Sequence, residues 1–218
     1  MELSHPWTAV LEPGRTTWGG SQRLDPDPVL AKCGCGVIAA LDTLIYLHRH
    51  RPGFTQPLFR ALSAKGGVSG TAYHQWTDTL RRRYFPLFPP FGVNGWAMAA
   101  GLNRYCRDNR LPLRAKWGTS RLWETMAAQL AADLPVILCI GTCLPGRKLT
   151  LYVQKDGLWK PGTTVSAHFV TVTAMDDAWL TVSSWGRKYG IRRAEFDQYV
   201  RSASGPLLSN ILVLRPEK

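Results

Sequence analysis

The chain has 218 residues, 45% of them hydrophobic, and a formal net charge of +12 at pH 7. This composition excludes disorder over most of the chain and fits one large domain, or two lobes that share a core. The first residues lack a basic stretch followed by an apolar one, and no apolar run approaches the roughly 18 residues of a membrane helix. We therefore expect a soluble, cytoplasmic protein with no membrane span.

The positive charge would suit a polyanionic partner, because basic surfaces attract phosphate groups. The basic residues are nevertheless dispersed, and their densest cluster is Arg81-Arg82-Arg83. Dispersed clusters of this kind are typical of solvated surfaces. Nucleic-acid binding is therefore a third alternative that rests on the net charge alone.

Five cysteines without a secretory signal indicate a reducing compartment and free thiols. A zinc ion could be bound by the sulfur atoms of four of them, Cys33, Cys35, Cys139 and Cys143. Their C-x-C and C-x-x-x-C spacings differ from the usual C-x-x-C zinc knuckle. We expect no metal and no cofactor.

The first half of the chain is predicted to be mainly helical. Residues 1–30 are rich in proline and glycine without a clear period, so we expect an extended segment. The apolar run from about Cys35 to His48 predicts a central helix that is buried on most sides. Helix-capping residues and helix-ending prolines predict three further helices, from Ser69 to Tyr84, from Asn94 to about Asp108 and from Ser120 to about Ala132. A short strand is expected from Leu113 to Trp117.

From Leu134 onward the pattern changes to strands, with a hairpin turn indicated at Asp176-Asp177. Helices followed by an antiparallel sheet predict an α+β fold. We expect a single domain over residues 1–218, with a mainly helical lobe at about 31–132 and an antiparallel β lobe at about 133–218. The expected elements of that lobe are strands at 135–140, 149–154, 167–174, 179–184 and 210–214, and a short helix at 195–201.

The segment Cys33-Gly34-Cys35-Gly36 leads directly into the central helix. A cysteine at a helix N-terminus meets unpaired backbone N–H groups and the positive end of the helix dipole, which favour a reactive thiolate. The same amides, including that of Gly36, are suited to holding an oxyanion. The segment therefore predicts a cysteine nucleophile.

A cysteine nucleophile needs a base and a group that orients the base. His168 opens an apolar strand directly after a loop rich in Gly, Thr and Ser, whereas the other histidines lie in polar contexts. The hairpin after His168 returns at Ser183-Ser184-Trp185-Gly186. We therefore predict that His168 is the base and that Ser183 orients its imidazole.

The Ser184-Trp185-Gly186 sequence, followed by Tyr189-Gly190, resembles the Asn-Ser-Trp-Gly motif of papain-like cysteine peptidases, in which the Asn holds the catalytic His. The order of elements is also similar, and His168 follows Cys35 by 133 positions, within the roughly 130 to 150 of that superfamily. The resemblance implies a papain-like fold in which the active-site helix packs on the antiparallel sheet.

The Cys-Gly-x-x-Ala-Ala sequence of residues 35–40 looks closer to the bacterial branch that includes the double-glycine leader peptidases and their uncharacterised relatives. This resemblance implies that Cys35, and not Cys33, is the nucleophile. It also implies an oxyanion glutamine upstream, for which Gln22 is the only candidate. Asn94 is a further polar candidate, while Ser184 and Trp185 come from the motif as substrate-site residues, Trp185 resembling the Trp that shields the His.

Together these residues predict a cysteine peptidase or related hydrolase that acts on an amide or peptide bond through a thiolate and an acyl-enzyme. Its partner would be a peptide or protein substrate. Ser183 in place of Asn or Asp leaves open a catalytically impaired, peptidase-like protein that binds peptides. An acyltransferase or amidase on the same fold is the other alternative, because the same groups serve any acyl acceptor.

Overall fold

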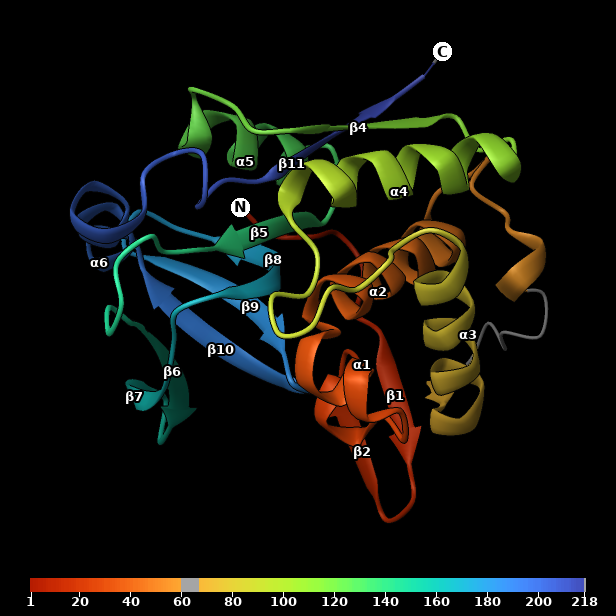
Figure 1. Cartoon of the computed structure of the whole chain (residues 1–218), viewed down its shortest axis with the longest axis horizontal. Helices are drawn as coiled ribbons and strands as arrows, with labels where there is room; N and C mark the ends of the chain where they lie inside the picture. Colours follow the sequence, from red (N-terminus) through yellow and green to blue (C-terminus); the bar gives the residue numbers. More distant parts are fainter. Residues whose placement is uncertain (60–66, 218) are drawn as a thin grey trace.

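A computed structural model describes residues 1–59 and 67–217. Helices and strands are both well represented, so the α+β prediction is confirmed. The long helices precede most of the strands, as Figure 1 shows. The helices are α1 (Pro28–Cys33), α2 (Cys35–His50), α3 (Gly70–Arg83), α4 (Gly95–Asp108), α5 (Leu122–Ala131) and α6 (Arg193–Tyr199), with short 3-10 turns η1 (Gln22–Leu24) and η2 (Pro57–Phe59) and a π turn η3 (Val200–Ser204).

The largest sheet has six strands in the order β5-β8-β9-β10-β6-β7, and each neighbouring pair is antiparallel. A second sheet has the order β2-β1-β3, and β11 pairs with β4. The strands are β1 (Ala9–Glu12), β2 (Arg15–Trp18), β3 (Val68–Ser69), β4 (Leu113–Trp117), β5 (Val136–Ile140), β6 (Leu149–Lys155), β7 (Leu158–Val165), β8 (His168–Met175), β9 (Trp179–Ser184), β10 (Arg187–Arg192) and β11 (Leu212–Pro216).

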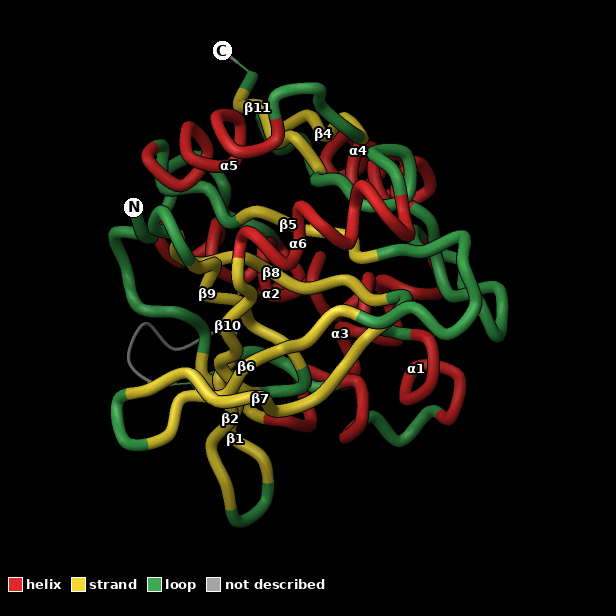
Figure 2. Tube along the Cα trace, turned by 90° about the vertical axis from the view of Figure 1, so that its left-hand side faces the viewer, coloured by secondary structure: helices red, strands yellow, loops and turns green. Residues whose placement is uncertain are grey.

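Helix α2 is the centre of the structure. Every residue from Gly36 to Leu47 is buried, because the large sheet covers the helix on one side and α3 covers it on another. Helices α5 and α6 pack on the opposite face of the sheet, and Figure 2 shows α6 in front of the strands with α2 behind them. Two apolar cores result, one on each face of the sheet. This arrangement fixes the first turn of α2 against the start of β8.

The predicted elements agree with the structure for α2 to α5, for β4, and for the hairpin of β8 and β9. Residues 1–30 differ from the expected extended segment, because they contain the β1–β2 hairpin, η1 and the start of α1. Strands β7 and β10 were not predicted. Their sequences are interrupted by Pro161, Gly162 and Gly190, which are poor strand formers on their own, and pairing with neighbouring strands overrides that preference.

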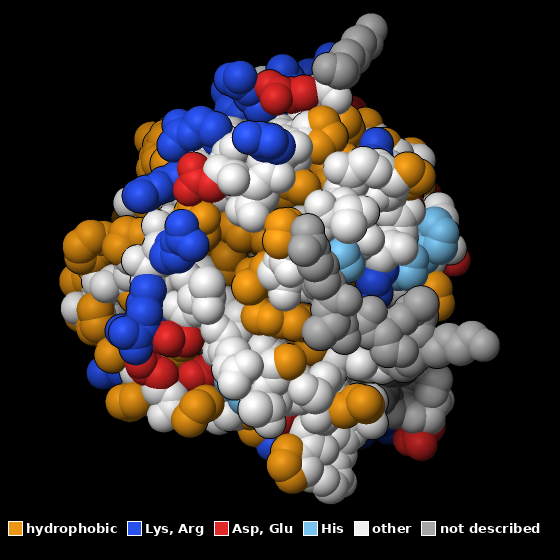
Figure 3. Space-filling model, turned by 90° about the vertical axis from the view of Figure 1, so that its right-hand side faces the viewer, with side chains coloured by type: hydrophobic (Ala, Val, Ile, Leu, Met, Phe, Trp, Pro, Cys, Tyr) orange, Lys and Arg blue, Asp and Glu red, His pale blue; other side chains and the backbone are white. Residues whose placement is uncertain are grey.

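The surface carries its charge in a dispersed pattern. Figure 3 shows Lys and Arg side chains along one side of the visible face, with acidic side chains and apolar groups between them. Within the described residues, no helix is both long enough and apolar enough to cross a membrane.

Candidate functional site

Cys35 is the first residue of α2, directly after the tight junction with α1 at Gly34. The junction requires glycine, because a Cβ on Gly34 would lie 2.5 Å from the Leu30 carbonyl oxygen. The sulfur of Cys35 accepts hydrogen bonds from the backbone N–H groups of Phe169 and Gly36, which lower the pKa of the thiol. Burial has the larger effect and raises that pKa. The resting cysteine is therefore a neutral thiol, contrary to the thiolate expected from the helix end alone.

His168 begins β8 and is buried at 6% exposure. Its Nε2 atom lies 2.6 Å from the Ser184 hydroxyl oxygen. Burial, and then the positive charge of Arg23, lower the pKa of His168 to about 3. The imidazole is thus neutral near pH 7, and its Nδ1 atom is left for a second partner.

The hydroxyl that meets the imidazole belongs to Ser184, not to Ser183, which corrects the sequence-based prediction. Ser183 lies opposite Thr171 in the β8–β9 pair and donates to the Trp18 carbonyl oxygen at 3.1 Å. Opposite residues in an antiparallel pair share a face, and successive residues alternate. Ser184 therefore lies on the same face as His168, and Ser183 lies on the other.

Trp185 stacks on His168, with ring centroids 4.3 Å apart and planes 23° from parallel. Trp185 and Gly186 form the two-residue turn between β9 and β10 with φ values of 48° and 72°. Turns with two positive φ values favour Asn-Gly, and a Trp at the first position costs on the order of 1–3 kcal/mol. The guanidinium of Arg23 covers the Trp185 ring at 4.0 Å from its centroid and helps to hold this conformation.

Two cavities meet at Cys35, His168 and Phe169. The inner cavity is small, at about 10 Å³, which is about the space one water needs, and Gln22 and Trp185 are among its lining residues. The outer groove measures about 190 Å³. Its wall is mostly apolar and includes Phe91, Val93, Trp96, Trp117, Leu207 and Leu208.

The other predicted site residues lie around these cavities. Gln22 is buried in the inner cavity, where its Nε2 donates to the carbonyl oxygens of Ala31 and Lys32 at 3.2 and 3.3 Å. Asn94 lines the outer groove, but its side chain already accepts from the Ala97 amide as the N-cap of α4. Gly36 packs against Val93, where a Cβ would come within 2.6 Å of the Val93 Cγ1 atom. Cys35 and His168 thus line both cavities, while Gln22, Ser183, Ser184 and Trp185 line only the inner one and Asn94 lines only the outer one.

Asp42 is a buried carboxyl in the inner cavity that the sequence analysis missed. It lies about two turns after Cys35 on α2, accepts the Tyr73 hydroxyl at 2.7 Å, and accepts the Gly20 amide at 3.1 Å. Burial raises the pKa of Asp42 to about 7. The signal in the sequence was an acidic residue within an otherwise apolar stretch of helix.

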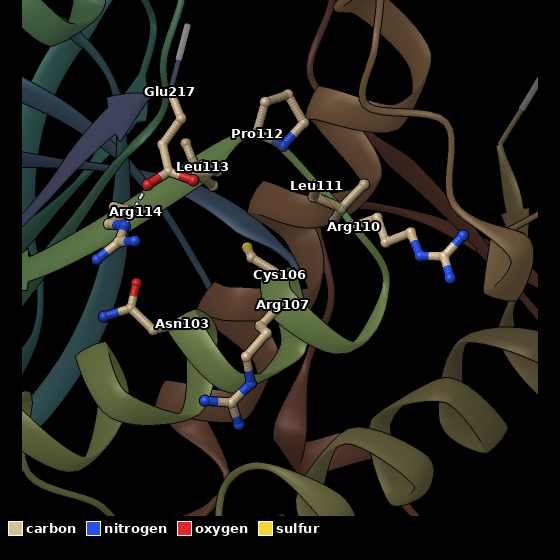
Figure 4. A pocket seen from close by; sticks show the side chains of 9 residues that line it. All are labelled: Asn103, Cys106, Arg107, Arg110, Leu111, Pro112, Leu113, Arg114 and Glu217. Atoms are coloured by element: carbon tan, nitrogen blue, oxygen red, sulfur yellow. Dashed lines mark hydrogen bonds and ion pairs between the residues drawn. The ribbon is translucent and has the colours of Figure 1, made fainter.

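A larger cavity of about 430 Å³ lies elsewhere, between the end of α4 and β4. Figure 4 shows that the guanidinium groups of Arg107, Arg110 and Arg114 point away from one another there. They do not converge on a common anion. Among the described residues, no group of three or more His, Cys, Asp or Glu side chains is placed to hold a metal ion.

The comparisons with known proteins bear on the fold. No protein-family model matches the chain, and no curated protein matches it at a significant level. Among solved structures, the chain is similar to the crystal structure of a "putative C39-like peptidase" from Bacillus anthracis, with a TM-score of 0.51 and 13% identity. The match covers 91% of this chain and 95% of that chain. At this identity the similarity shows a common fold.

Proposed function

We propose that the protein is a papain-like cysteine peptidase, or a related hydrolase, that cleaves an amide or peptide bond through Cys35 and His168. The proposal rests chiefly on one observation. A cysteine at a helix start and a buried histidine held by a hydroxyl line the same two cavities, a small inner one and a larger outer groove. The fold shared with the Bacillus anthracis structure supports it.

The chemistry follows from the protonation states. Because Nε2 of His168 faces Ser184, the neutral imidazole with its N–H on Nε2 leaves Nδ1 as the proton acceptor. Cys35 gives its proton to Nδ1 as the sulfur attacks the carbonyl carbon and a C–S bond forms. The carbonyl oxygen takes the negative charge, and backbone N–H groups at the start of α2 are suited to hold it.

Collapse of that intermediate breaks the C–N bond, and His168 returns the proton to the departing amine. Water, activated by the neutral imidazole, then hydrolyses the acyl-enzyme and releases the acid. An added amine in place of water would give acyl transfer, so both reactions share one intermediate. The narrower relationship to the double-glycine leader peptidase branch is supported by the Cys35-Gly36 start of α2.

Two observations favour a second candidate, a peptide-binding protein with little turnover. The group at His168 is the hydroxyl of Ser184, which has no charge to stabilise the imidazolium that forms during attack. The raised pKa of Cys35 and the lowered pKa of His168 both oppose a thiolate–imidazolium pair at rest.

The test is the acyl-enzyme itself. The protein is mixed with a library of activated peptide esters, quenched in acid and analysed by mass spectrometry for an acyl adduct. We expect one adduct per chain on Cys35, with none in Cys35→Ala and an unchanged level in the control Cys33→Ala. Adducts on several cysteines would refute a special role for Cys35. Peptide binding without any adduct would favour the second candidate.

A further inference from the structure

A three-layer stack of Arg23, Trp185 and His168 extends the proposed site outward. The imidazole lies on Trp185 at 4.3 Å between centroids, and the Arg23 guanidinium carbon lies 4.0 Å from the Trp185 ring centroid. Trp185 is half-buried between the two, whereas Arg23 is exposed. The outermost layer therefore presents a positive charge to solvent two layers from the proposed base.

This charge has no acidic partner in the described part of the chain, because Arg23 forms no ion pair there. The nearby carboxylates are already engaged, Asp25 with His74 and Asp27 with Arg81. Asp27 also accepts the amides at the start of α1. The structure around Arg23 thus leaves the guanidinium free to bind an anion.

Two further cations lie near this stack, and one of them, Arg187, extends its positive surface. Arg187 and Lys188 follow the Trp185-Gly186 turn, are exposed and form no ion pair within the described residues. Their segment is tied to the segment of Arg23, because the Gly186 amide donates to the Gly20 carbonyl oxygen at 2.8 Å. Arg187 lies opposite Ser184 and shares its face, whereas Lys188 lies opposite Ser183 on the other face, where its ammonium is 5.9 Å from the Trp18 ring centroid. The side of the site around Trp185 is therefore cationic, while the outer groove is apolar.

The proposed reaction places the leaving segment of the substrate on the cationic side of the site, next to Trp185. His168 must protonate the departing amine, so the segment after the scissile bond leaves past His168 and the Trp185 that stacks on it. The acyl segment is bonded to Cys35 and has the apolar groove beside it. We propose, on the basis of that reaction, that Arg23 determines specificity by binding a carboxylate in the leaving segment of the substrate.

The carboxylate has two sources that the same guanidinium would bind. It belongs either to an acidic side chain near the new N-terminus or to the free C-terminus of a short leaving segment. Arg is suited to both, because its planar fork matches the two oxygens of a carboxylate. Burial is the main cause of the lowered pKa of His168, and the positive charge of Arg23 is the second cause, which a bound carboxylate would offset.

The test compares peptides that differ only in the leaving segment. Matched pairs carry Glu or Gln in the first two leaving positions, and a second set ends in a free carboxylate or an amide. We expect kcat/KM to be about two- to fivefold higher for the acidic member at low salt, and the preference to shrink at high salt because the pair is exposed. A preference in the Glu/Gln pairs identifies an acidic side chain as the bound carboxylate, and a preference in the carboxylate/amide pairs identifies the C-terminus.

Variants test the residue. Arg23→Gln should remove the preference and Arg23→Glu should reverse it toward a Lys-containing peptide, whereas the exposed control Arg15→Gln should leave it unchanged. A preference that persists in Arg23→Gln overturns the inference. So does cleavage by the wild type with equal kcat/KM for both members of each pair.

A binding experiment separates this inference from the proposed function. The same peptides are titrated into Cys35→Ala and into Cys35→Ala/Arg23→Gln by calorimetry. If the wild type cleaves nothing but Cys35→Ala binds the acidic peptides more tightly and the double variant does not, the specificity role stands and the peptidase proposal fails. If no peptide is cleaved or bound, both proposals are overturned.

Discussion

The buried carboxyl of Asp42 makes a quantitative prediction about stability. Its pKa is 3.8 when the side chain is free in water, and burial raises it to about 7 in the folded protein. The unfolded chain therefore releases this proton near pH 4, whereas the folded protein keeps it until about pH 7. Between these values the folded state binds more protons, so this group makes the free energy of unfolding fall as pH rises.

The size of the effect follows from the two pKa values. At about 1.36 kcal/mol for each pKa unit, the ionised Asp42 lowers the free energy of unfolding by up to about 4 kcal/mol above pH 7. Asp42→Asn keeps an oxygen to accept the Tyr73 hydroxyl but carries no charge. The variant should match the wild type near pH 4 and exceed its stability by up to about 4 kcal/mol at pH 8.

His168 acts in the opposite direction over an overlapping range. Its folded pKa of about 3 lies below its ordinary value of 6.5, so this group lowers stability as pH falls through that interval. The wild-type curve will consequently be flatter than either contribution alone. Only the difference between wild type and Asp42→Asn isolates the carboxyl.

The assay is urea unfolding at constant ionic strength between pH 4 and pH 8, with Asp177→Asn as a control. Asp177 is fully exposed at the turn between β8 and β9, and its ion pair with Arg193 at 3.8 Å is also open to solvent, so its replacement should change the stability little. A difference between wild type and Asp42→Asn that stays constant across this range would refute the reasoning. So would a destabilised variant at pH 8.

Two predictions concern the residues around His168. Ser184→Ala leaves the buried Nε2–H of His168 without an acceptor, so we expect a loss of about 1–3 kcal/mol in stability and slower adduct formation on Cys35. The control Ser183→Ala should slow adduct formation less, because Ser183 donates to Trp18 and not to His168. The reverse order in the mass-spectrometric assay would contradict the pairing of Ser184 with His168. Trp185→Asn places a residue that favours the left-handed turn at this position, but it uncovers the imidazole of His168. We therefore expect the pKa of His168, measured by NMR, to rise toward 6.5, while the stability falls only a little. An unchanged pKa would show that Trp185 does not bury His168.

The sequence was sufficient for features that depend on local pattern. The apolar run after Cys35 predicted the buried helix, because only a helix at the centre of a fold can be apolar on nearly every side. Capping residues located the starts of α3 and α4 at Ser69 and Asn94, because these side chains satisfy the first free amides of a helix. The Asp176-Asp177 turn likewise predicted the β8–β9 hairpin, because turn chemistry is also local.

Register and burial were decided by the tertiary structure. A shift of one residue moves a side chain to the other face of a sheet, and the sequence does not fix the shift that places Ser184, and not Ser183, against His168. The protonation state of Cys35 also could not be read from its helix position, because burial in the folded protein raises the pKa of the thiol more than the N–H groups of Phe169 and Gly36 lower it.

The cysteine at the head of the central helix was thus determined by the sequence alone. Its surroundings were decided only when the chain folded, since α2, the start of β8 and the β9–β10 turn meet through packing between residues more than a hundred positions apart. Such contacts depend on the shape of the whole core, which no local pattern encodes. For the same reason, the stack of Arg23, Trp185 and His168 became visible only in three dimensions.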